Sequence, residues 1–200
     1  MDELTRLARA AGRGDDAALA MFVRQTHPDV WRFCAHLVDP AAADDLTQDT
    51  YVRAIPALRG FRGDASVRTW LLAIARRACA AEIGARSRDR RLASRLVATA
   101  PGALAGHEQA PDAHAVADLL LSGLEPDRRA AFLLTQMLGC SYAEAAAICG
   151  CPIGTIRSRV ARAREDLIVM TADTGTLPAG RAGHAASRPD AAKSATGNCR

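Results

Sequence analysis

Apolar residues recur every three to four positions along most of the first 170 residues, which is the spacing of amphipathic helices. The pattern predicts helices over residues 4–11, 17–37, 40–58 and 66–85, with Pro28 expected to kink or break the second. The sequence has no run of alternating β-branched residues bounded by hairpin turns. We therefore expect an all-α fold, divided between two small helical domains.

Residues 140–167 contain two short helical patterns around a tight turn. In the first, apolar residues stand at Tyr142, Ala145, Ala146 and Cys149, and Gly150 then supplies the turn. In the second, the expected buried stripe is Ile153, Ile156, Val160, Ala163 and Leu167. This spacing is typical of a helix-turn-helix unit that binds DNA.

The polar face of that second helix has residue types suited to DNA. It consists of Thr155, Ser158 and Arg162, flanked by Arg157 and Arg159. Guanidinium groups bond phosphates and guanine edges, and hydroxyls bond phosphates. An ordinary helical hairpin with a solvated basic face is the alternative that the motif alone leaves open.

Asp39 and Pro40 form the start signal of a helix, an N-cap followed by proline at the first helical position. One face of this helix is expected in the core: Thr47, Tyr51, Ala54, Ile55 and Leu58. The other face is acidic with a valine in its middle: Asp45, Gln48, Asp49 and Val52. The pattern fits either solvent exposure or docking to a protein surface. An α-helical enzyme is not favoured, because no nucleophile, metal cluster or substrate loop accompanies the carboxylates.

A loop over residues 59–65 combines two arginines, two glycines and Phe61. An aromatic platform with nearby arginines suits stacking and phosphate neutralisation of a flipped or single-stranded base. The spacing is not that of a phosphate-binding P-loop. In the following helix Val67, Trp70, Leu71, Ile74 and Ala78 mark the expected core side, and Thr69, Ala73, Arg76 and Ala80 the opposed strip. Trp70 is thus assigned to the core rather than to base stacking.

Charge and cysteine usage narrow the functional class. The net charge is only +4, but residues 76–95 hold seven arginines against two acidic residues. Two basic segments indicate two nucleic-acid contacts. The six cysteines show no paired CxxC or zinc spacing, so core or incidental positions are favoured over metal binding. If Cys149 and Cys151 are exposed, this CxC pair is a candidate for redox sensitivity. No signal peptide or membrane-spanning apolar run is found in the sequence, which predicts a cytoplasmic protein without membrane insertion.

Two long stretches then carry a family resemblance. ADDLTQDTYVRAIPALRGFRGDASVRTWLLAIARR resembles the second domain of the extracytoplasmic-function group of bacterial sigma factors. LEPDRRAAFLLTQMLGCSYAEAAAICGCPIGTIRSRVARAREDL is similar to the fourth domain of the same family. The two occur in the expected order without a third domain between them. The finer motifs most resemble the actinobacterial sigma-C branch.

The resemblance implies an organisation and a set of partners. The sigma-2-like domain would span residues 1–92, a flexible linker 93–113, the sigma-4-like domain 114–170 and a disordered tail 171–200. The chain would be an alternative sigma factor that binds RNA polymerase core and promoter DNA. It would have no catalytic residue, cofactor or metal of its own, and an anti-sigma factor could hold it inactive.

The resemblance also assigns roles to residues, and the acidic helical face is the first. Asp45, Gln48, Asp49 and Val52 would dock on the clamp helices of the largest polymerase subunit. Phe61, Arg62, Gly63, Asp64, Arg76 and Arg77 would contact the −10 element. Thr155, Arg157, Ser158, Arg159 and Arg162 would contact the −35 element. A stand-alone helix-turn-helix regulator is the alternative, but it leaves the first domain's loop and acidic face unexplained.

Overall fold

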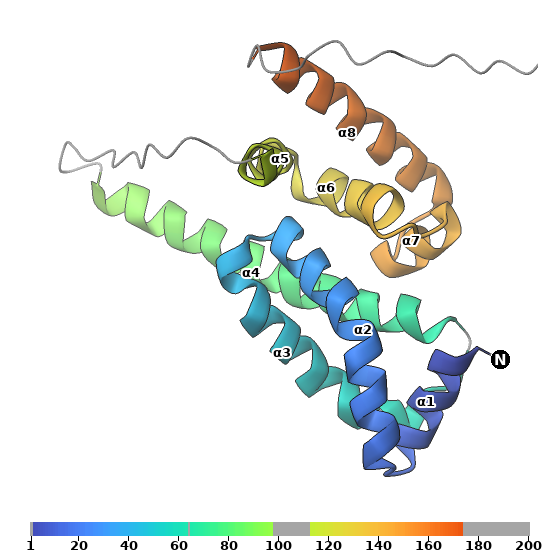
Figure 1. Cartoon of the computed structure of the whole chain (residues 1–200). Coiled ribbons are helices and arrows are strands. Elements are labelled where there is room, and N and C mark those ends of the chain that lie inside the picture. The colour runs from blue at the N-terminus through green and yellow to red at the C-terminus, as the bar shows by residue number, and fades with distance from the viewer. Residues whose placement is uncertain (1, 64, 98–112, 174–200) are drawn as a thin grey trace, which may run out of the picture.

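The structure is a computed structural model that describes residues 2–63, 65–97 and 113–173, and Figure 1 shows the course of the chain. The first part contains α1 (Glu3–Gly12), α2 (Asp16–Leu37), α3 (Pro40–Ala57), the short 3-10 helix η1 (Leu58–Gly60) and α4 (Val67–Val97). The second contains α5 (Ala113–Ser122), α6 (Pro126–Phe132), the π-helical turn η2 (Leu133–Met137), α7 (Tyr142–Cys149) and α8 (Ile153–Asp173). The described residues include no strand, so the all-α prediction is confirmed.

Local capping explains where the helices begin and end. The Asp2, Asp15 and Asp39 side chains accept hydrogen bonds from backbone N–H groups in the first turns of α1, α2 and α3, at 2.8, 2.9 and 2.9 Å. Ser141 and Glu144 form a capping box at the start of α7. Gly150 ends α7 with φ of +64°, a conformation that favours glycine. The predicted N-cap at Asp39 and turn at Gly150 are both confirmed.

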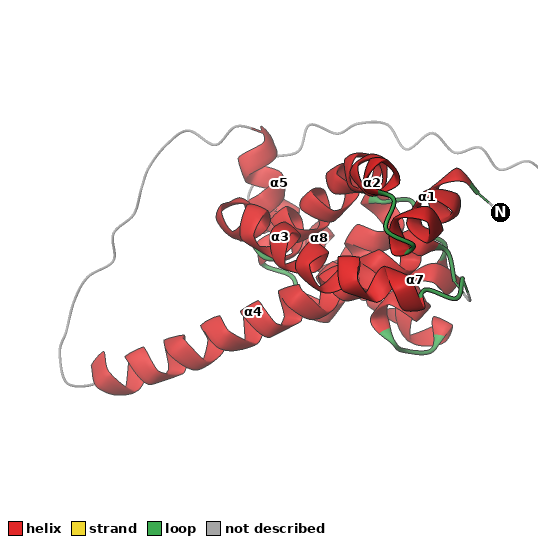
Figure 2. Ribbon diagram, turned by 90° about the horizontal axis from the view of Figure 1, so that it is seen from below, coloured by secondary structure: helices red, strands yellow, loops and turns green. Residues whose placement is uncertain are grey.

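One helix is not interrupted at its proline, and another runs further than the sequence pattern predicted. The α2 helix continues through Pro28 without ending there. The α4 helix was expected to stop near Ala85 but extends to Val97, because the residues after Gly84 are mostly arginine, alanine and leucine, which are good helix formers. Figure 2 shows this last part of α4 projecting from the body of the molecule. We call residues 86–97 the α4 arm.

Apolar side chains from the helices of the first domain form a closely packed core. Phe22, Val30 and Phe33 of α2 are fully buried against Val67, Leu71 and Leu72 of α4. The α3 helix adds Tyr51, Ala54 and other residues of its predicted core face, although Ile55 is half-exposed. Thr69, which was expected on the polar strip of α4, is buried because its hydroxyl pairs with Ser66 at the helix start. The core holds α3 and the start of α4 in fixed positions.

The core of the second domain confirms the middle of the predicted helix-turn-helix stripe. Ile156, Val160 and Ala163 of α8 are buried. Tyr142 and Ile153, predicted as buried, are instead 37% and 43% exposed. Each is the first residue of its helix. The two residues were predicted as buried because helical periodicity shows which side of a helix faces the core. It does not show how far along the helix neighbouring elements cover that side.

The two domains lie against each other. Helix α7 contacts α4, and α2 contacts α5, α6 and η2. Figure 1 shows α5, α6 and α7 between α8 and the helices of the first domain. The compact arrangement therefore brings together side chains that are more than 50 positions apart in sequence.

Candidate nucleic-acid and polymerase interface

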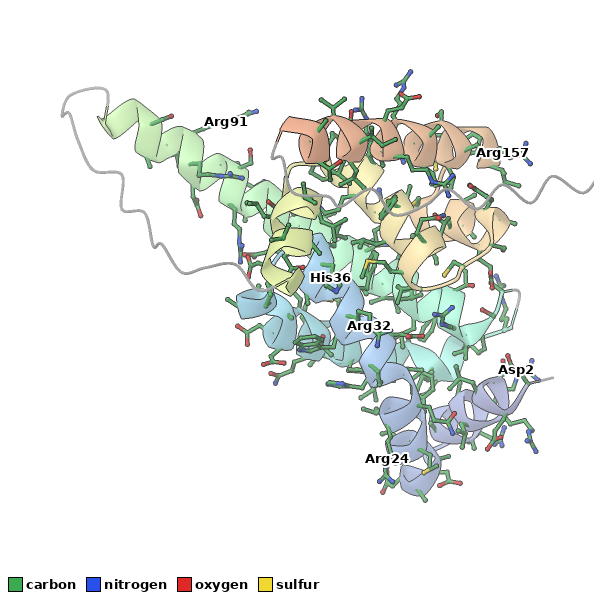
Figure 3. All side chains as sticks on the ribbon, turned by 45° about the horizontal axis from the view of Figure 1, so that its top comes forward. Asp2, Arg24, Arg32, His36, Arg91 and Arg157 are labelled. Carbon is green, nitrogen blue, oxygen red and sulfur yellow. The ribbon has the colours of Figure 1, made fainter. Side chains whose placement is uncertain are left out.

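The exposed face of α8 carries most of the side chains predicted to meet the −35 element. Arg157, Ser158 and Arg162 are exposed, and Thr155 is half-buried. The Ser158 hydroxyl donates to the carbonyl oxygen of Thr155 at 2.9 Å. Figure 3 shows Arg157 at the outer end of α8, directed away from the other helices. This surface has the form of a recognition helix with arginines near its N-terminus.

Arg159 differs from the other arginines on this helix. Its guanidinium group forms an ion pair with Asp127 of α6, and its side chain is 23% exposed. A second nitrogen lies 3.7 Å from the Cys151 sulfur. Of the three arginines predicted for the −35 element, Arg159 is therefore the one that forms an ion pair with a described residue. Sequence reasoning missed Asp127 as its partner.

Asp127 also binds an arginine of the first domain. The Arg76 guanidinium on α4 lies 2.9 Å from the other carboxylate oxygen of Asp127. One carboxylate thus holds an arginine predicted for the −10 element and one predicted for the −35 element. The Arg76 Nε is buried and finds no hydrogen-bond partner among the described residues. Arg77, the next residue, is exposed.

The loop that was predicted to hold an unstacked base does line a cavity. The cavity has a volume of about 220 Å³ and is formed by Gly60, Phe61, Arg62, Gly63, Ala65 and Trp70. The rings of Phe61 and Trp70 are 5.4 Å apart between centroids and tilted by 52°. Trp70 is half-buried, packs against the core as predicted and also lines this cavity.

The backbone of the same loop is held from outside. Arg9 of α1 donates to the carbonyl oxygen of Arg62 at 3.2 Å. Gly63 has φ of +85°, so a side chain at this position would strain the turn. Asp64 lies outside the described residues. The loop therefore owes its shape to contacts from α1 and to a glycine conformation.

The acidic face of α3 is exposed as one surface. Asp45, Gln48 and Val52 are exposed, and Val52 reaches 64%. Asp49 is half-buried and pairs with Arg53 one turn later, with Nε and Oδ1 2.9 Å apart. Sequence reasoning missed Arg53, although the i, i+4 spacing signals such a pair. An uncovered valine between carboxylates fits a protein-docking surface.

Further ion pairs and hydrogen bonds join the two domains. Arg68 of α4 pairs with Asp29 at 2.6 Å and also donates to the carbonyl oxygen of Leu138 at 2.7 Å. His36 of α2 lies 2.7 Å from Asp118 of α5. These polar contacts add to the apolar packing that connects the two domains.

The cysteines of the turn give little support to a redox role. Burial raises the pKa of Cys149 to about 11, which keeps its thiol protonated near neutral pH. Cys151 is half-buried. Among residues 2–63, 65–97 and 113–173, no group of three or more histidine, cysteine or acidic side chains is arranged to hold a metal ion. In the same residues, no helix combines the length and apolar character needed to span a membrane.

Both halves of the chain match family models of known proteins. The model of sigma-70 region 2 matches residues 22–89, and the model of sigma-70 region 4 matches residues 115–167. The ECF RNA polymerase sigma factor SigC of Mycobacterium tuberculosis is 49% identical over 175 residues, which cover 84% of this chain and 90% of the relative.

Two solved structures share the fold. One is the sigma factor RpoE in complex with the anti-sigma factor NepR from Bartonella quintana, with 30% identity and a TM-score of 0.59 over 77% of this chain and 96% of that one. The other is CnrH in complex with the cytosolic domain of CnrY, with 25% identity and a TM-score of 0.65 over 86% and 99%. The chain belongs to the extracytoplasmic-function group of the sigma-70 family of RNA polymerase sigma factors. This membership supports an alternative sigma factor over a stand-alone regulator.

Proposed function

We propose that this chain directs bacterial RNA polymerase core to promoters through two DNA surfaces and one docking surface. The observation that carries the proposal is that one sigma-70 chain has both an exposed basic face on α8 and the Phe61–Trp70 cavity, two candidate nucleic-acid surfaces. Polymerisation belongs to the core enzyme, and this chain supplies positioning only. Because it acts on polymerase and chromosome, it works in the cytoplasm.

The α8 face is proposed to read the −35 element. Arg157 and Arg162 are exposed and lie near the N-terminal half of the helix, the part that enters the major groove in helix-turn-helix proteins. Each arginine suits a bidentate contact with guanine or a bond to phosphate. Thr155 and Ser158 add hydroxyls that suit phosphate contacts.

The cavity in the first domain is proposed to hold one unstacked base of the −10 element. Phe61 and Trp70 supply aromatic surface, and the glycines at 60 and 63 leave room for close approach of a nucleotide backbone. Arg62, Arg76 and Arg77 would neutralise the phosphates on either side, with Asp64 in the same loop. Capture of an unstacked base would favour the open duplex.

The compact arrangement of the two domains restrains one arginine of each proposed DNA surface. Arg76 and Arg159 cannot bind phosphates while Asp127 holds both of them. Binding to promoter DNA therefore requires that these ion pairs be exchanged for phosphate contacts, which separation of the two domains would allow. Partners such as the anti-sigma factor NepR, bound by the relative RpoE, suggest that an anti-sigma factor could hold this chain inactive as well.

The α3 face is proposed to dock on the clamp helices of the largest polymerase subunit. Asp45 and Asp49 would pair with basic side chains there, and Val52 would lose its exposed apolar surface on binding. The double variant Asp45→Lys/Asp49→Lys should lose most core polymerase in a pull-down, because like charges placed opposite each other cost several kcal/mol. The matched control is Asp16→Lys, an exposed acid on α2. Equal retention by both variants contradicts the docking face.

Run-off transcription tests the function as a whole. Purified core polymerase is combined with a library of promoter fragments, with and without the chain. Transcripts that require the chain, and that share two spaced upstream elements, are the expected result. If the chain instead binds duplex DNA alone and stimulates no transcript with its cognate core, the sigma proposal fails.

A further inference from the structure

A larger cavity lies where the two domains meet, at the base of the α4 arm. Its volume is about 600 Å³, within the range of small-molecule sites. Apolar side chains such as Leu37, Ile83 and Leu124 line one part of it. Its charged lining residues are all arginines: Arg86, Arg90 and Arg129. The cavity therefore combines an apolar wall with three arginines, of which Arg86 is paired with carboxylates while Arg90 forms no ion pair with a described residue.

Arg129 is the most deeply buried charge at this junction, with only 8% of its surface exposed. Its terminal nitrogens donate to three carbonyl oxygens: those of Leu37 at 3.1 Å, Leu124 at 3.2 Å and Ser122. All three acceptors are neutral, and no described carboxylate forms an ion pair with it. Its Nε is buried without a hydrogen-bond partner among the described residues.

A buried guanidinium without a counter-ion is costly. Burial lowers the pKa of Arg129, and the nearby Glu125 carboxylate only partly offsets this effect. A buried cation is normally paired with an anion. An unpaired buried polar atom in a folded protein calls for an explanation, and a bound ion or an ordered water can supply one. An anion that reached Arg129 from the cavity would compensate its buried charge.

On the α4 side of the cavity, Arg90 is the arginine without an ion pair to a described residue. Arg86 and Arg90 lie one helical turn apart, a spacing at which like charges repel. Arg86 is bound by Asp39 and by Glu82, the latter at 2.6 Å. Arg90 is exposed, and its Nε donates only to the carbonyl oxygen of Arg86, at 3.3 Å. An anion between Arg90 and Arg129 would relieve both charges.

We propose that this cavity binds a nucleoside phosphate. The phosphate groups would lie against Arg86, Arg90 and Arg129, and the base would lie against the apolar wall. A ligand there would touch α2 and α4 of the first domain and the α5–α6 junction of the second. It would therefore stabilise the compact arrangement. If the chain acts as proposed above, bound ligand reduces promoter binding, and this consequence alone rests on the proposed function.

The test is a calorimetric titration of the full chain with each of four probes: GTP, ATP, pyrophosphate and inorganic phosphate. The variant Arg90→Gln removes one cavity arginine that makes no ion pair with a described residue. The matched control is Arg91→Gln, the next residue on the arm, which is exposed and does not line the cavity; Figure 3 marks its place. Because a hydrogen bond to a charged group is a strong one, we expect Arg90→Gln to weaken nucleotide binding about tenfold or more. Arg91→Gln should change it less than about twofold.

Three outcomes overturn the inference. One is the absence of saturable binding by any of the four probes. Another is an equal loss in Arg90→Gln and Arg91→Gln, which would reveal a general attraction of the arm for anions. The third is displacement of the bound nucleotide by a short DNA duplex, with Arg90→Gln weakening the binding of nucleotide and duplex by the same factor. That result would show that the cavity arginines bind DNA phosphates. Nucleotide binding is measured on the isolated chain, and the proposed function is measured by run-off transcription. If any of these three results occurs while run-off transcription is normal, this inference fails and the proposed function does not.

Discussion

The two proposed DNA surfaces are built in different ways. The α8 face is one continuous helix whose arginines at 157 and 162 point outward regardless of what the rest of the chain does. The −10 surface is assembled from a loop, the start of α4 and a contact from α1, and one of its arginines is held by a carboxylate of the other domain. The arginines at 157 and 162 are exposed in the compact arrangement, whereas the assembled surface depends on contacts between several elements.

The largest expected effect belongs to the single-helix surface. Replacing Arg157 and Arg162 with alanine should weaken binding of the −35 element by about 1–3 kcal/mol for each lost bidentate contact. Fluorescence anisotropy with a labelled promoter duplex and the holoenzyme measures the change. Arg164→Ala is the matched control, because Arg164 on the same helix is bound to Gln136 at 2.7 Å. Unchanged recognition in the double variant would remove the proposed reading face.

The assembled surface should respond to loss of its aromatic wall. Trp70→Ala removes one side of the base cavity and should reduce stable promoter opening by about 1–3 kcal/mol, the value of one stacked base. Permanganate reactivity of unpaired thymines measures opening, and circular dichroism checks the fold. Trp31→Ala, a half-buried tryptophan on α2 that bonds Asp44, serves as the control. An equal effect of both substitutions would assign Trp70 to packing alone.

Loss of the Asp127 carboxylate, which Arg76 and Arg159 share, should have a smaller effect on DNA binding, and in the opposite direction. Asp127→Asn should release Arg76 and Arg159, so the isolated chain should bind promoter DNA more tightly. Asp127 and both arginines are partly exposed, so the ion pairs are worth about 0.2–1 kcal/mol each after solvent screening. The measurement is the affinity of the isolated chain for promoter DNA at low salt. Weaker or unchanged binding would show that Asp127 does not restrain these arginines.

The smallest expected effect concerns the stability of the two domains at low pH. Hydrogen bonds from the backbone and hydroxyl of Ser141 lower the pKa of Glu144 below its ordinary value of 4.5. The folded-state pKa is therefore below the unfolded one. The stabilisation is complete above the unfolded value and is lost as pH falls through the folded value.

Glu144→Gln should remove this contribution, so the variant should lose less stability than the wild type between about pH 5 and pH 3. The urea midpoint of the second domain, followed over this range, measures the difference. Asp16→Asn on the first domain is the control, since Asp16 is exposed and begins α2 without a capping box. Parallel pH dependence in wild type and Glu144→Gln would show that the capping box makes no net contribution.

The sequence predicted most of the fold because most of its signals are local. Caps such as Asp39, the turn at Gly150 and the periodic core positions of α8 depend on residues within one or two turns of each other. The end of α4 was missed because no proline or capping glycine marks it, and helix propensity carried the helix on to Val97. The position of Trp70 in the core was predicted, but its second position as a cavity wall was missed, because periodicity does not show where a cavity lies.

By itself, the sequence determined the all-α class, the helix-turn-helix and the three candidate surfaces on α3, on the 59–65 loop and on α8. Only the tertiary structure decided which of the predicted DNA-binding arginines are held in ion pairs. Asp127 reaches Arg76 from 51 positions away, and Arg129 reaches the carbonyl oxygen of Leu37 from 92 positions away. No local pattern encodes such pairs, because their partners are chosen by how helices pack and not by spacing along the chain. The domain junction, with its ion pairs and its arginine-lined cavity, is therefore a property of the fold alone.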